Sequence, residues 1–221
     1  MLKVISFDVE GTLITHQFSK IVWEEAIPKL YSEKTGISQD EAGSYIKREY
    51  NKVSEAQIEW YDIKYWFNHF GLIDYEKILN RYKNEVVYFA EVKQVLKELN
   101  KKYLLIINSN SANEFLNFEV EKIKRYFHRI FSSPTDFRQT KKKSNVYLKI
   151  CNILKVRPTE IVHVGDRWND DYIVPRKIGI TAFFLDREGK KKGKFVVKDL
   201  NEFKIKVAML KDENNSPSST H

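Results

Sequence analysis

Cysteine is almost absent from this chain, which has a single one, Cys151, among its 221 residues. One cysteine forms no internal disulfide, and this usage is typical of a reducing cytoplasm. Long apolar runs are also lacking, because no stretch approaches the roughly 20 residues of a membrane-spanning helix. The N-terminus reaches Asp8 before the apolar core of a signal peptide could form. We therefore expect a cytoplasmic protein with no membrane segment.

Acidic residues are in the minority, with 30 Asp and Glu against 38 Lys and Arg and a formal net charge of +8. A positive excess can serve nucleic acid, a membrane surface or a phosphorylated small substrate. The lysines are spread along the whole chain, and no ladder of aromatic and arginine residues indicates single-strand binding. We interpret the charge as a Lys-rich soluble surface and expect no nucleic-acid partner. A hydrophobic content of 42% suffices for a core and a lobe beside it.

The stretch that organises the chain lies near its start. The apolar run from Leu2 to Phe7 predicts a strand buried on both faces. Asp8 falls where this run stops, and ligands bind at the carboxyl ends of strands in an open α/β sheet. Glu10 follows, and Gly11 permits a sharp turn. Two acids this close repel each other at neutral pH unless a cation or a proton lies between them. Taken alone, the segment is as consistent with a strand and an ordinary acidic turn as with a ligand-binding site.

The segment Asp8-Val9-Glu10-Gly11-Thr12 resembles the first motif of the haloacid dehalogenase (HAD) superfamily, in its phosphatase branch. The common motif has aspartate at the second acidic position, where this chain has Glu10. The enolase-phosphatase branch also has glutamate there, so the departure is compatible with the family.

Helical spacing of apolar residues, without a strand-like run, extends from about Thr15 to Tyr88. Ser38 to Glu41 is typical of a helix start, and the aromatic-rich stretch Glu59 to Phe70 predicts a buried or pocket-lining helix that Gly71 stops. HAD phosphatases of the first cap type carry a helical cap at this point. We expect a cap over residues 15–87, a core of residues 1–14 and 88–210, and a disordered tail over 211–221. An ordinary helical subdomain is the alternative reading.

Two more segments resemble the second and third HAD motifs. Ser109-Asn110 follows the apolar run Tyr103 to Ile107, and its hydroxyl and amide can donate hydrogen bonds to a phosphoryl oxygen. A lysine triplet, residues 141–143, precedes an apolar helical pattern. Placing Tyr147 on the aromatic residue of the family's helix puts Lys141 at the catalytic lysine, although either neighbour could be the true one. Without the other motifs, a lysine triplet indicates a solvated charge run.

The fourth motif is the most specific. An apolar strand, Glu160 to Val164, runs into Gly165-Asp166 and then Asp170-Asp171. The spacing to Gly179 favours Asp171 over Asp170 as the second acid of this HAD signature. Carboxylates gathered at the end of a buried strand need a cation to relieve their repulsion. His163, within the strand, is expected to be packed or hydrogen-bonded.

The four motifs follow the family order between Leu2 and Leu185. The resemblance implies an α/β, HAD-like (Rossmann-type) fold, with a doubly wound, mainly parallel sheet and a helical cap inserted after the first strand. It also implies a Mg²⁺-dependent phosphatase for a small phosphorylated substrate. Asp8 would form an aspartyl-phosphate, and Glu10 would act as general acid and base.

The resemblance also implies two sets of contacts. Mg²⁺ would be bound by Asp8, the main chain of Glu10, Asp166 and Asp171. The substrate phosphate would be bound by Thr12, Ser109, Asn110 and Lys141. Two alternatives remain: a 2-haloacid dehalogenase-type hydrolase, which attacks carbon without a metal and lacks an acid at the position of Glu10, and a catalytically lapsed binding protein. The natural substrate and the oligomeric state are marked by no motif.

Overall fold

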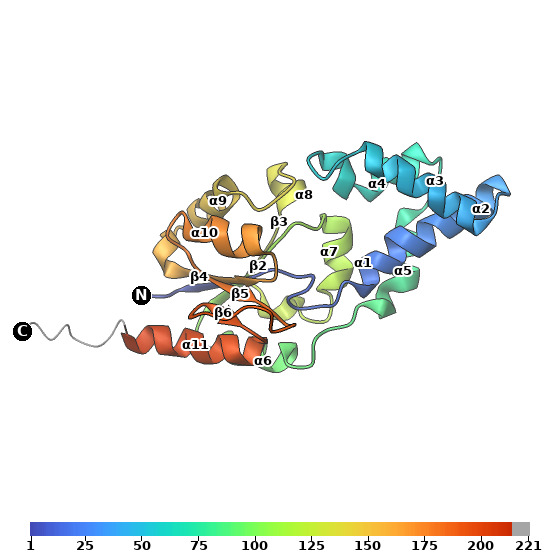
Figure 1. Cartoon of the computed structure of the whole chain (residues 1–221). Helices are drawn as coiled ribbons and strands as arrows, with labels where there is room; N and C mark the ends of the chain where they lie inside the picture. The colour runs from blue at the N-terminus through green and yellow to red at the C-terminus, as the bar shows by residue number, and fades with distance from the viewer. Residues whose placement is uncertain (214–221) are drawn as a thin grey trace, which may run out of the picture.

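A six-stranded, fully parallel sheet forms the centre of the core in this computed structural model, which describes residues 1–213. The strand order is β3-β2-β1-β4-β5-β6, so the first strand of the chain lies in the middle of the sheet (Figure 1). Phe7 is paired with Ile107 on one side and with Val164 on the other. The strands are β1 (Val4–Phe7), β2 (Leu104–Ser109), β3 (Arg129–Ser132), β4 (Ile161–Gly165), β5 (Thr181–Leu185) and β6 (Val196–Val197). The predicted doubly wound α/β fold is confirmed.

Helices cover both faces of this sheet. Residues alternate between the two faces along β1, so Phe7 packs on Phe203 of one layer, with ring centroids 5.8 Å apart, while Val4 joins a second apolar cluster with Val146. Figure 1 shows α6 and α11 on one side of the sheet and α9 and α10 on the other. The core helices are α6 (Val92–Leu99), α7 (Asn113–Glu119), α8 (Ser133–Phe137), α9 (Ser144–Leu154), α10 (Val174–Arg176) and α11 (Leu200–Glu213).

Residues 15–87, which we call the cap, form a helical layer beside the carboxyl ends of the strands (Figure 1). The two connections to the core lie side by side, because Ile14 forms a β-bridge with Tyr88 and the main-chain N–H of Thr15 bonds the carbonyl of Val87 at 2.9 Å. The cap elements are α1 (Gln17–Ile21), η1 (Val22–Ala26), α2 (Ile27–Thr35), α3 (Gln39–Lys52), η2 (Ile58–Tyr61), α4 (Ile63–His69), α5 (Tyr75–Tyr82) and η3 (Lys83–Glu85).

The predicted start of α3 is confirmed in atomic detail. The main-chain N–H of Glu41 bonds the Ser38 hydroxyl at 3.3 Å, and the Glu41 carboxylate accepts the Ser38 N–H at 3.0 Å, so two unpaired helix-end donors are satisfied together. The predicted aromatic helix from Glu59 to Phe70 is instead split in two. Asp62 separates η2 from α4 because its carboxylate accepts the N–H groups that begin the second helix.

Other expectations need correction. The sequence from Phe115 to Phe127 favours one continuous helix, but α7 ends at Glu119, and the 3-10 turn η4 (Lys124–Tyr126) follows. The predicted tail began at residue 211, but α11 continues through Glu213, while residues 214–221 lie outside the described part of the chain. Strand β6 has only two residues and was not anticipated, because so short an edge strand has no period to recognise.

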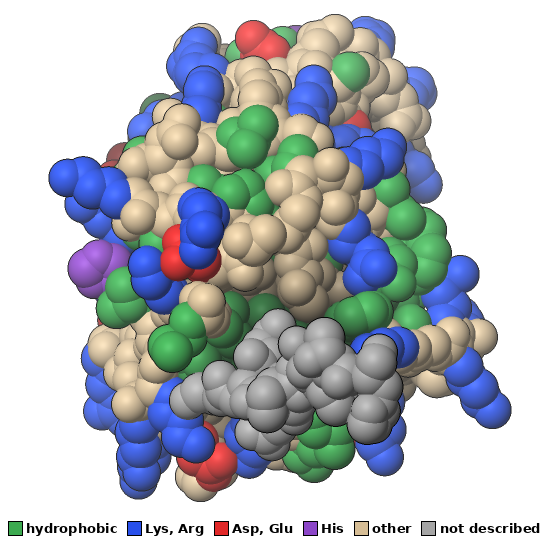
Figure 2. Space-filling view, turned by 90° about the vertical axis from the view of Figure 1, so that its left-hand side faces the viewer, with side chains coloured by type: hydrophobic (Ala, Val, Ile, Leu, Met, Phe, Trp, Pro, Cys, Tyr) green, Lys and Arg blue, Asp and Glu red, His purple; other side chains and the backbone are tan. Residues whose placement is uncertain are grey.

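The surface agrees with the analysis of composition. Figure 2 shows Lys and Arg side chains spread over the displayed face with apolar side chains between them. Cys151, the single cysteine of the chain, is buried in α9. Within residues 1–213, no helix combines the length and the apolar character needed to cross a bilayer.

Candidate active site

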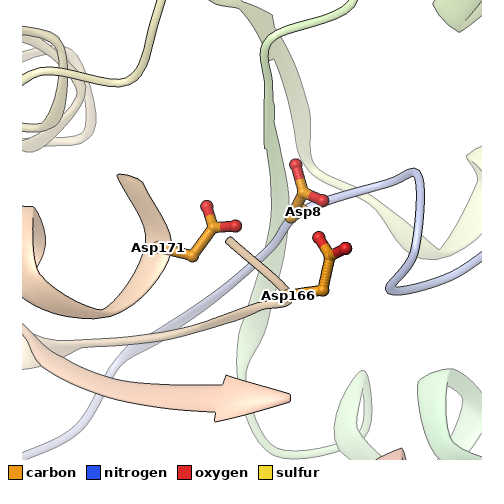
Figure 3. Close-up of side chains that lie close together, drawn as sticks. All are labelled: Asp8, Asp166 and Asp171. Atoms are coloured by element: carbon orange, nitrogen blue, oxygen red, sulfur yellow. The ribbon is translucent and has the colours of Figure 1, made fainter. Parts of the chain in front are cut away.

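Three carboxylates meet at the carboxyl edge of the sheet. Asp8 follows β1, Asp166 follows β4, and Asp171 lies in the π-helical turn η6 (Trp168–Ile173). Because β1 and β4 are parallel neighbours, their ends meet at one edge, and one oxygen of each carboxylate lies within 4.8 Å of the others. Figure 3 shows the three side chains pointing toward one another. This group could hold a metal ion through oxygen ligands.

Asp170, the alternative to Asp171, is turned away from this group. Its carboxylate accepts hydrogen bonds from Asn110 Nδ2 at 3.4 Å and from Asn169 Nδ2 at 2.9 Å. Of the two adjacent acids, the structure thus brings Asp171 to Asp8 and Asp166, in agreement with the spacing argument from Gly179.

Two glycines leave the space that these carboxylates occupy. Gly11 has a φ of +75°, and a Cβ there would collide with the Asp166 carboxylate. A Cβ on Gly165 would collide with the Asp171 side chain in the same way. The glycines of the first and fourth motifs therefore permit a close approach between backbone and carboxylate that a larger residue would block.

The lysine at the site is Lys142, so the prediction of Lys141 is wrong by one residue. Lys142 is fully buried, and its Nζ lies 2.5 Å from an oxygen of Asp8 and 2.5 Å from an oxygen of Asp171. Lys141 instead points to the cap, where its Nζ lies 3.0 Å from Glu55.

The local main chain explains this register. The side-chain oxygen of Asn110 accepts the main-chain N–H of Lys142 at 2.9 Å, which fixes the lysine segment against the end of β2. The Tyr147 hydroxyl donates to the carbonyl of Asp170 at 2.9 Å, so α9 is tied to the fourth motif as well. The spacing to Tyr147 placed the lysine on the correct segment, but the two tertiary bonds select which residue turns inward.

Hydrogen bonds with His163 and with the main chain of Arg167 hold the Asp171 carboxylate in place. His163 Nε2 lies 3.1 Å from Asp171 Oδ1, and its Nδ1 lies 2.9 Å from the Ser6 hydroxyl. The main-chain N–H of Arg167 donates to Asp171 Oδ2 at 3.0 Å. His163 is therefore hydrogen-bonded within the strand layer, as expected. It touches an oxygen of a candidate metal ligand without joining the carboxylate group itself.

The electrostatics of the two acids differ. Burial raises the pKa of Asp8 to about 7, against the opposing effect of Lys142. Burial also acts to raise the pKa of Asp171, but Lys142 and His163 outweigh it and hold this pKa below its ordinary value. Asp171 therefore stays ionised as the fixed anion of the network, and the state of Asp8 depends on the cations beside it.

A cavity of about 830 Å³ opens over this edge, with the core on one side and the cap on the other. Asp8, Glu10, Ser109 and Asn110 line its core wall. Thr12 is not among the lining residues, because its side chain is fully buried and donates to Asp8 Oδ2 at 3.4 Å. The structure thus brings Ser109 and Asn110 to the cavity but places Thr12 behind the predicted nucleophile.

Glu10 lies in the wall of the same cavity as Asp8. One of its oxygens, Oε1, is buried and has no hydrogen-bonding partner among residues 1–213. Burial raises the pKa of Glu10 above its ordinary value. A raised pKa makes the Glu10 carboxyl group better suited to donate a proton than an ordinary carboxyl group would be.

His16, Glu119 and Arg167 are among the cavity residues that the sequence did not reveal. His16 Nε2 lies 3.8 Å from Asp166, and this interaction raises the pKa of His16. Arg167 directly follows Asp166, so the fourth motif could have indicated it. Glu119 is fully buried, yet no motif marks it, because it lies ten residues past Ser109 in a helix that carries no other signal.

The chain is similar to two kinds of curated protein. The chain is 29% identical to the GMP/IMP nucleotidase YrfG of Escherichia coli (strain K12) over 68 residues, which cover 31% of this chain and 30% of that protein. It is 23% identical to the glyceraldehyde 3-phosphate phosphatase of Pyrococcus furiosus over 246 aligned positions, covering 100% of this chain and 98% of that protein.

Solved structures share the fold. A HAD phosphatase from Thermococcus onnurineus matches with a TM-score of 0.80 and 24% identity, over 93% of this chain and 98% of its own. A 2-haloacid dehalogenase from Pseudomonas syringae pv. Tomato DC3000 matches with a TM-score of 0.70 and 19% identity, over 95% and 100%. The model of the haloacid dehalogenase-like hydrolases matches residues 2–179. The chain therefore belongs to the haloacid dehalogenase-like hydrolase family.

Proposed function

We propose that this hydrolase is a Mg²⁺-dependent phosphatase that cleaves a small phosphate monoester through an aspartyl-phosphate on Asp8. The observation that carries the proposal is the presence of a second acid, Glu10, in the cavity that Asp8 also lines. Phosphoryl transfer needs a nucleophile, charge neutralisation and a proton donor for the leaving group. Asp8 and Glu10, in the core wall of the cavity, would supply the nucleophile and the proton donor, and Lys142, buried beside Asp8, would contribute to charge neutralisation.

The residues at the sheet edge fit Mg²⁺. All three candidate ligands are carboxylates, the donor type that this ion prefers, and Asp166 Oδ1 is buried without a hydrogen-bonding partner within residues 1–213. Asp8, Asp166 and Asp171 would hold the ion with the main chain of Glu10, and Mg²⁺ would neutralise charge on the phosphoryl oxygens.

The reaction would use the chain's own groups in two stages. An oxygen of Asp8 attacks phosphorus while Glu10 gives its proton to the departing alkoxide, which leaves as an alcohol. Water then attacks the phosphorus of the aspartyl-phosphate, Glu10 takes a proton from that water, and phosphate and the Asp8 carboxylate are released. Lys142 and the hydroxyl and amide of Ser109 and Asn110 would offset charge on the phosphoryl group.

The similarity to dehalogenases supplies the second candidate. Dehalogenases of this superfamily attack carbon, need no metal and lack an acid at the position of Glu10, as the family resemblance implies. Glu10 and the carboxylate group with Asp166 favour phosphorus over carbon. The nucleotidase and phosphatase relatives support the same choice, because their names refer to phosphorylated small molecules.

The deciding experiment measures nitrophenyl phosphate hydrolysis by the purified chain. We expect activity with Mg²⁺, its loss in excess chelator and its return when Mg²⁺ is restored. Asp8→Asn should reduce turnover to background, because the amide keeps the shape but removes the nucleophile. Full activity in chelator, or release of halide from 2-chloropropionate with no phosphatase activity, would overturn the proposal.

Glu10→Gln separates the two stages. A nitrophenolate leaves with little protonation, so this variant should release a burst of it and then turn over slowly as aspartyl-phosphate accumulates. Hydrolysis of an alkyl phosphate should fall about a hundredfold or more, because its alkoxide needs the proton. A pre-steady-state time course on both substrates gives the comparison. Wild-type rates on the alkyl phosphate would remove Glu10 from the mechanism.

A further inference from the structure

Glu119 is a buried carboxylate that the reaction described above does not use. It is the last residue of α7 and is fully buried. Neither of its carboxylate oxygens has a hydrogen-bonding partner among residues 1–213. Its main chain is well held, because the Tyr88 hydroxyl donates to its carbonyl at 2.7 Å where the chain re-enters the core from the cap.

The position of Glu119 in α7 directs it toward the cavity. Phe115 lies one turn earlier on the same helix face, and it stacks on Trp23 of the cap with centroids 5.2 Å apart and an interplanar angle of 19°. Phe115, Trp23 and Glu119 all line the cavity that contains Asp8 and Glu10. After burial, the charges of Glu10 and Asp8 are the largest causes that raise the pKa of Glu119, so these acids are close neighbours.

No cation of the described chain neutralises this group. Lys142 is held by Asp8 and Asp171 and makes no contact with Glu119. Ser111 lies near enough to lower the pKa of Glu119, but its hydroxyl is outside hydrogen-bonding geometry. A buried polar group without a partner costs free energy, so an unpaired carboxylate in a substrate cavity marks a position that a ligand atom can satisfy.

A second unpartnered atom faces the same cavity from the cap. The Tyr50 hydroxyl is buried without a hydrogen-bonding partner within residues 1–213, and Tyr50 lines the cavity. Trp23 links the two positions, since its ring contacts both Tyr50 and Phe115. Two unpaired polar groups on opposite walls fit a ligand that carries more than one hydrogen-bonding group.

We propose that Glu119 determines specificity by accepting a hydrogen bond from a hydroxyl group of the leaving alcohol, so that the substrate is a phosphate monoester of a polyhydroxylated alcohol. This inference rests on the proposed phosphatase function. A hydroxyl fits better than an ammonium group because it can donate to Glu119 and also exchange a hydrogen bond with the Tyr50 hydroxyl. The cavity of about 830 Å³ exceeds what a phosphate group needs, which leaves room for such an alcohol.

The test compares two matched substrates, glycerol 3-phosphate and propyl phosphate, which differ only in their hydroxyl groups. We expect wild-type kcat/KM to favour glycerol 3-phosphate by about tenfold or more, because propyl phosphate leaves the buried Glu119 carboxyl group without a hydrogen-bonding partner. Glu119→Leu should abolish the preference. Glu119→Gln keeps one acceptor oxygen and should retain part of it. Glu121→Leu, on an exposed residue two positions on, is the matched control and should keep the wild-type ratio.

Circular dichroism and thermal unfolding establish whether each variant is folded. If Glu119→Leu is unfolded, the comparison is made with Glu119→Gln alone. A preference for glycerol 3-phosphate that survives both substitutions in folded protein would overturn the inference. So would a wild-type enzyme that prefers ethanolamine phosphate to glycerol 3-phosphate, because Glu119 would then bind an ammonium group. A wild-type chain that hydrolyses no alkyl or nitrophenyl phosphate refutes the underlying phosphatase function instead.

Discussion

The two walls of the cavity are built on different principles. On the core wall, charged groups are joined at short distances, with Lys142 2.5 Å from both Asp8 and Asp171, and His163 3.1 Å from Asp171. On the cap wall, aromatic rings pack against one another, as in the contact between Tyr50 and Trp66 at 4.6 Å between centroids. The core wall stands on strand ends of a parallel sheet, whereas the cap wall stands on short helices held to the core by two adjacent connections.

This difference suits the core wall to hold the reacting groups and the cap wall to contact the rest of the substrate. A reacting group must be held within a fraction of an ångström, and strand ends with a hydrogen-bonded support provide that precision. Aromatic rings contribute contact area that depends less on exact position. We infer that the core wall fixes the reaction and that the cap wall, with Glu119 at the junction, selects the leaving group.

The largest loss of stability and activity is expected when Lys142, the buried cation beside the core wall, is removed. Lys142→Ala leaves Asp8 and Asp171 without their shared partner, and loss of one member of a buried ion pair costs about 3–5 kcal/mol of the free energy of unfolding. Removal of a group that offsets phosphoryl charge should also lower kcat about a hundredfold or more. Steady-state turnover of nitrophenyl phosphate and urea unfolding measure the two effects.

Lys141→Ala is the matched control for this change. Lys141 is partly exposed and pairs with Glu55 of the cap, so its loss should alter kcat by less than about threefold, as expected for a surface ion pair. If Lys141→Ala were the more damaging variant, the assignment of Lys142 to the site would be wrong.

A substitution in the cap wall is expected to have a smaller effect, and this effect should be on substrate binding. Trp60 lines the cavity and has a single ring contact among the described residues, with Tyr50 at 6.3 Å. Trp60→Leu should raise KM for a bulky phosphate monoester about three- to tenfold, because one aromatic contact is lost, while kcat changes little. Tyr31→Leu, on a cap residue whose ring stacks on Tyr45 outside the cavity lining, is the control and should leave KM unchanged. A fall in kcat with constant KM would show that the cap wall takes part in the chemistry.

The smallest effect on stability is expected from Glu160, which precedes β4 at the end of the strand away from the cavity. The Glu160 carboxylate accepts the main-chain N–H of Arg157 at 2.8 Å and pairs with Lys3 at 2.9 Å, and these contacts lower its pKa from 4.5 to about 2. Because the folded pKa is the lower one, the stabilisation is present above about pH 4.5 and is lost as the pH falls toward 2.

Glu160→Gln should therefore lower the free energy of unfolding modestly at pH 7, with a difference from wild type that narrows below about pH 4.5. Urea unfolding at pH 7 and pH 3 gives both differences. Nitrophenyl phosphate turnover at pH 7 should be unchanged, since Glu160 is not part of the cavity lining. A constant stability difference at the two pH values would contradict the assigned ion contacts.

Local signals in the sequence were enough for most of the fold. The run ending at Phe7, the run before Ser109 and the run from Glu160 to Val164 each gave a strand within a few residues of its observed bounds. Apolar periodicity is a local property of the sequence, so it can be recognised without knowing which segments pack together. The break at Asp62 and the early end of α7 were missed because a cap or a helix end depends on which hydrogen bonds the surrounding chain offers.

The sequence and its family resemblance were enough to predict that Asp8, Asp166 and Asp171 would come together, because acids that follow parallel strands share one edge of the sheet. Which lysine joins them could be seen only in the folded chain, because the hydrogen bond from the Lys142 N–H to Asn110 connects residues 32 positions apart and no periodicity encodes it. The folded chain was also needed to show that the Glu119 carboxyl group, near Glu10, has no hydrogen-bonding partner within residues 1–213. The absence of a partner is a property of the whole packed neighbourhood, to which distant segments contribute.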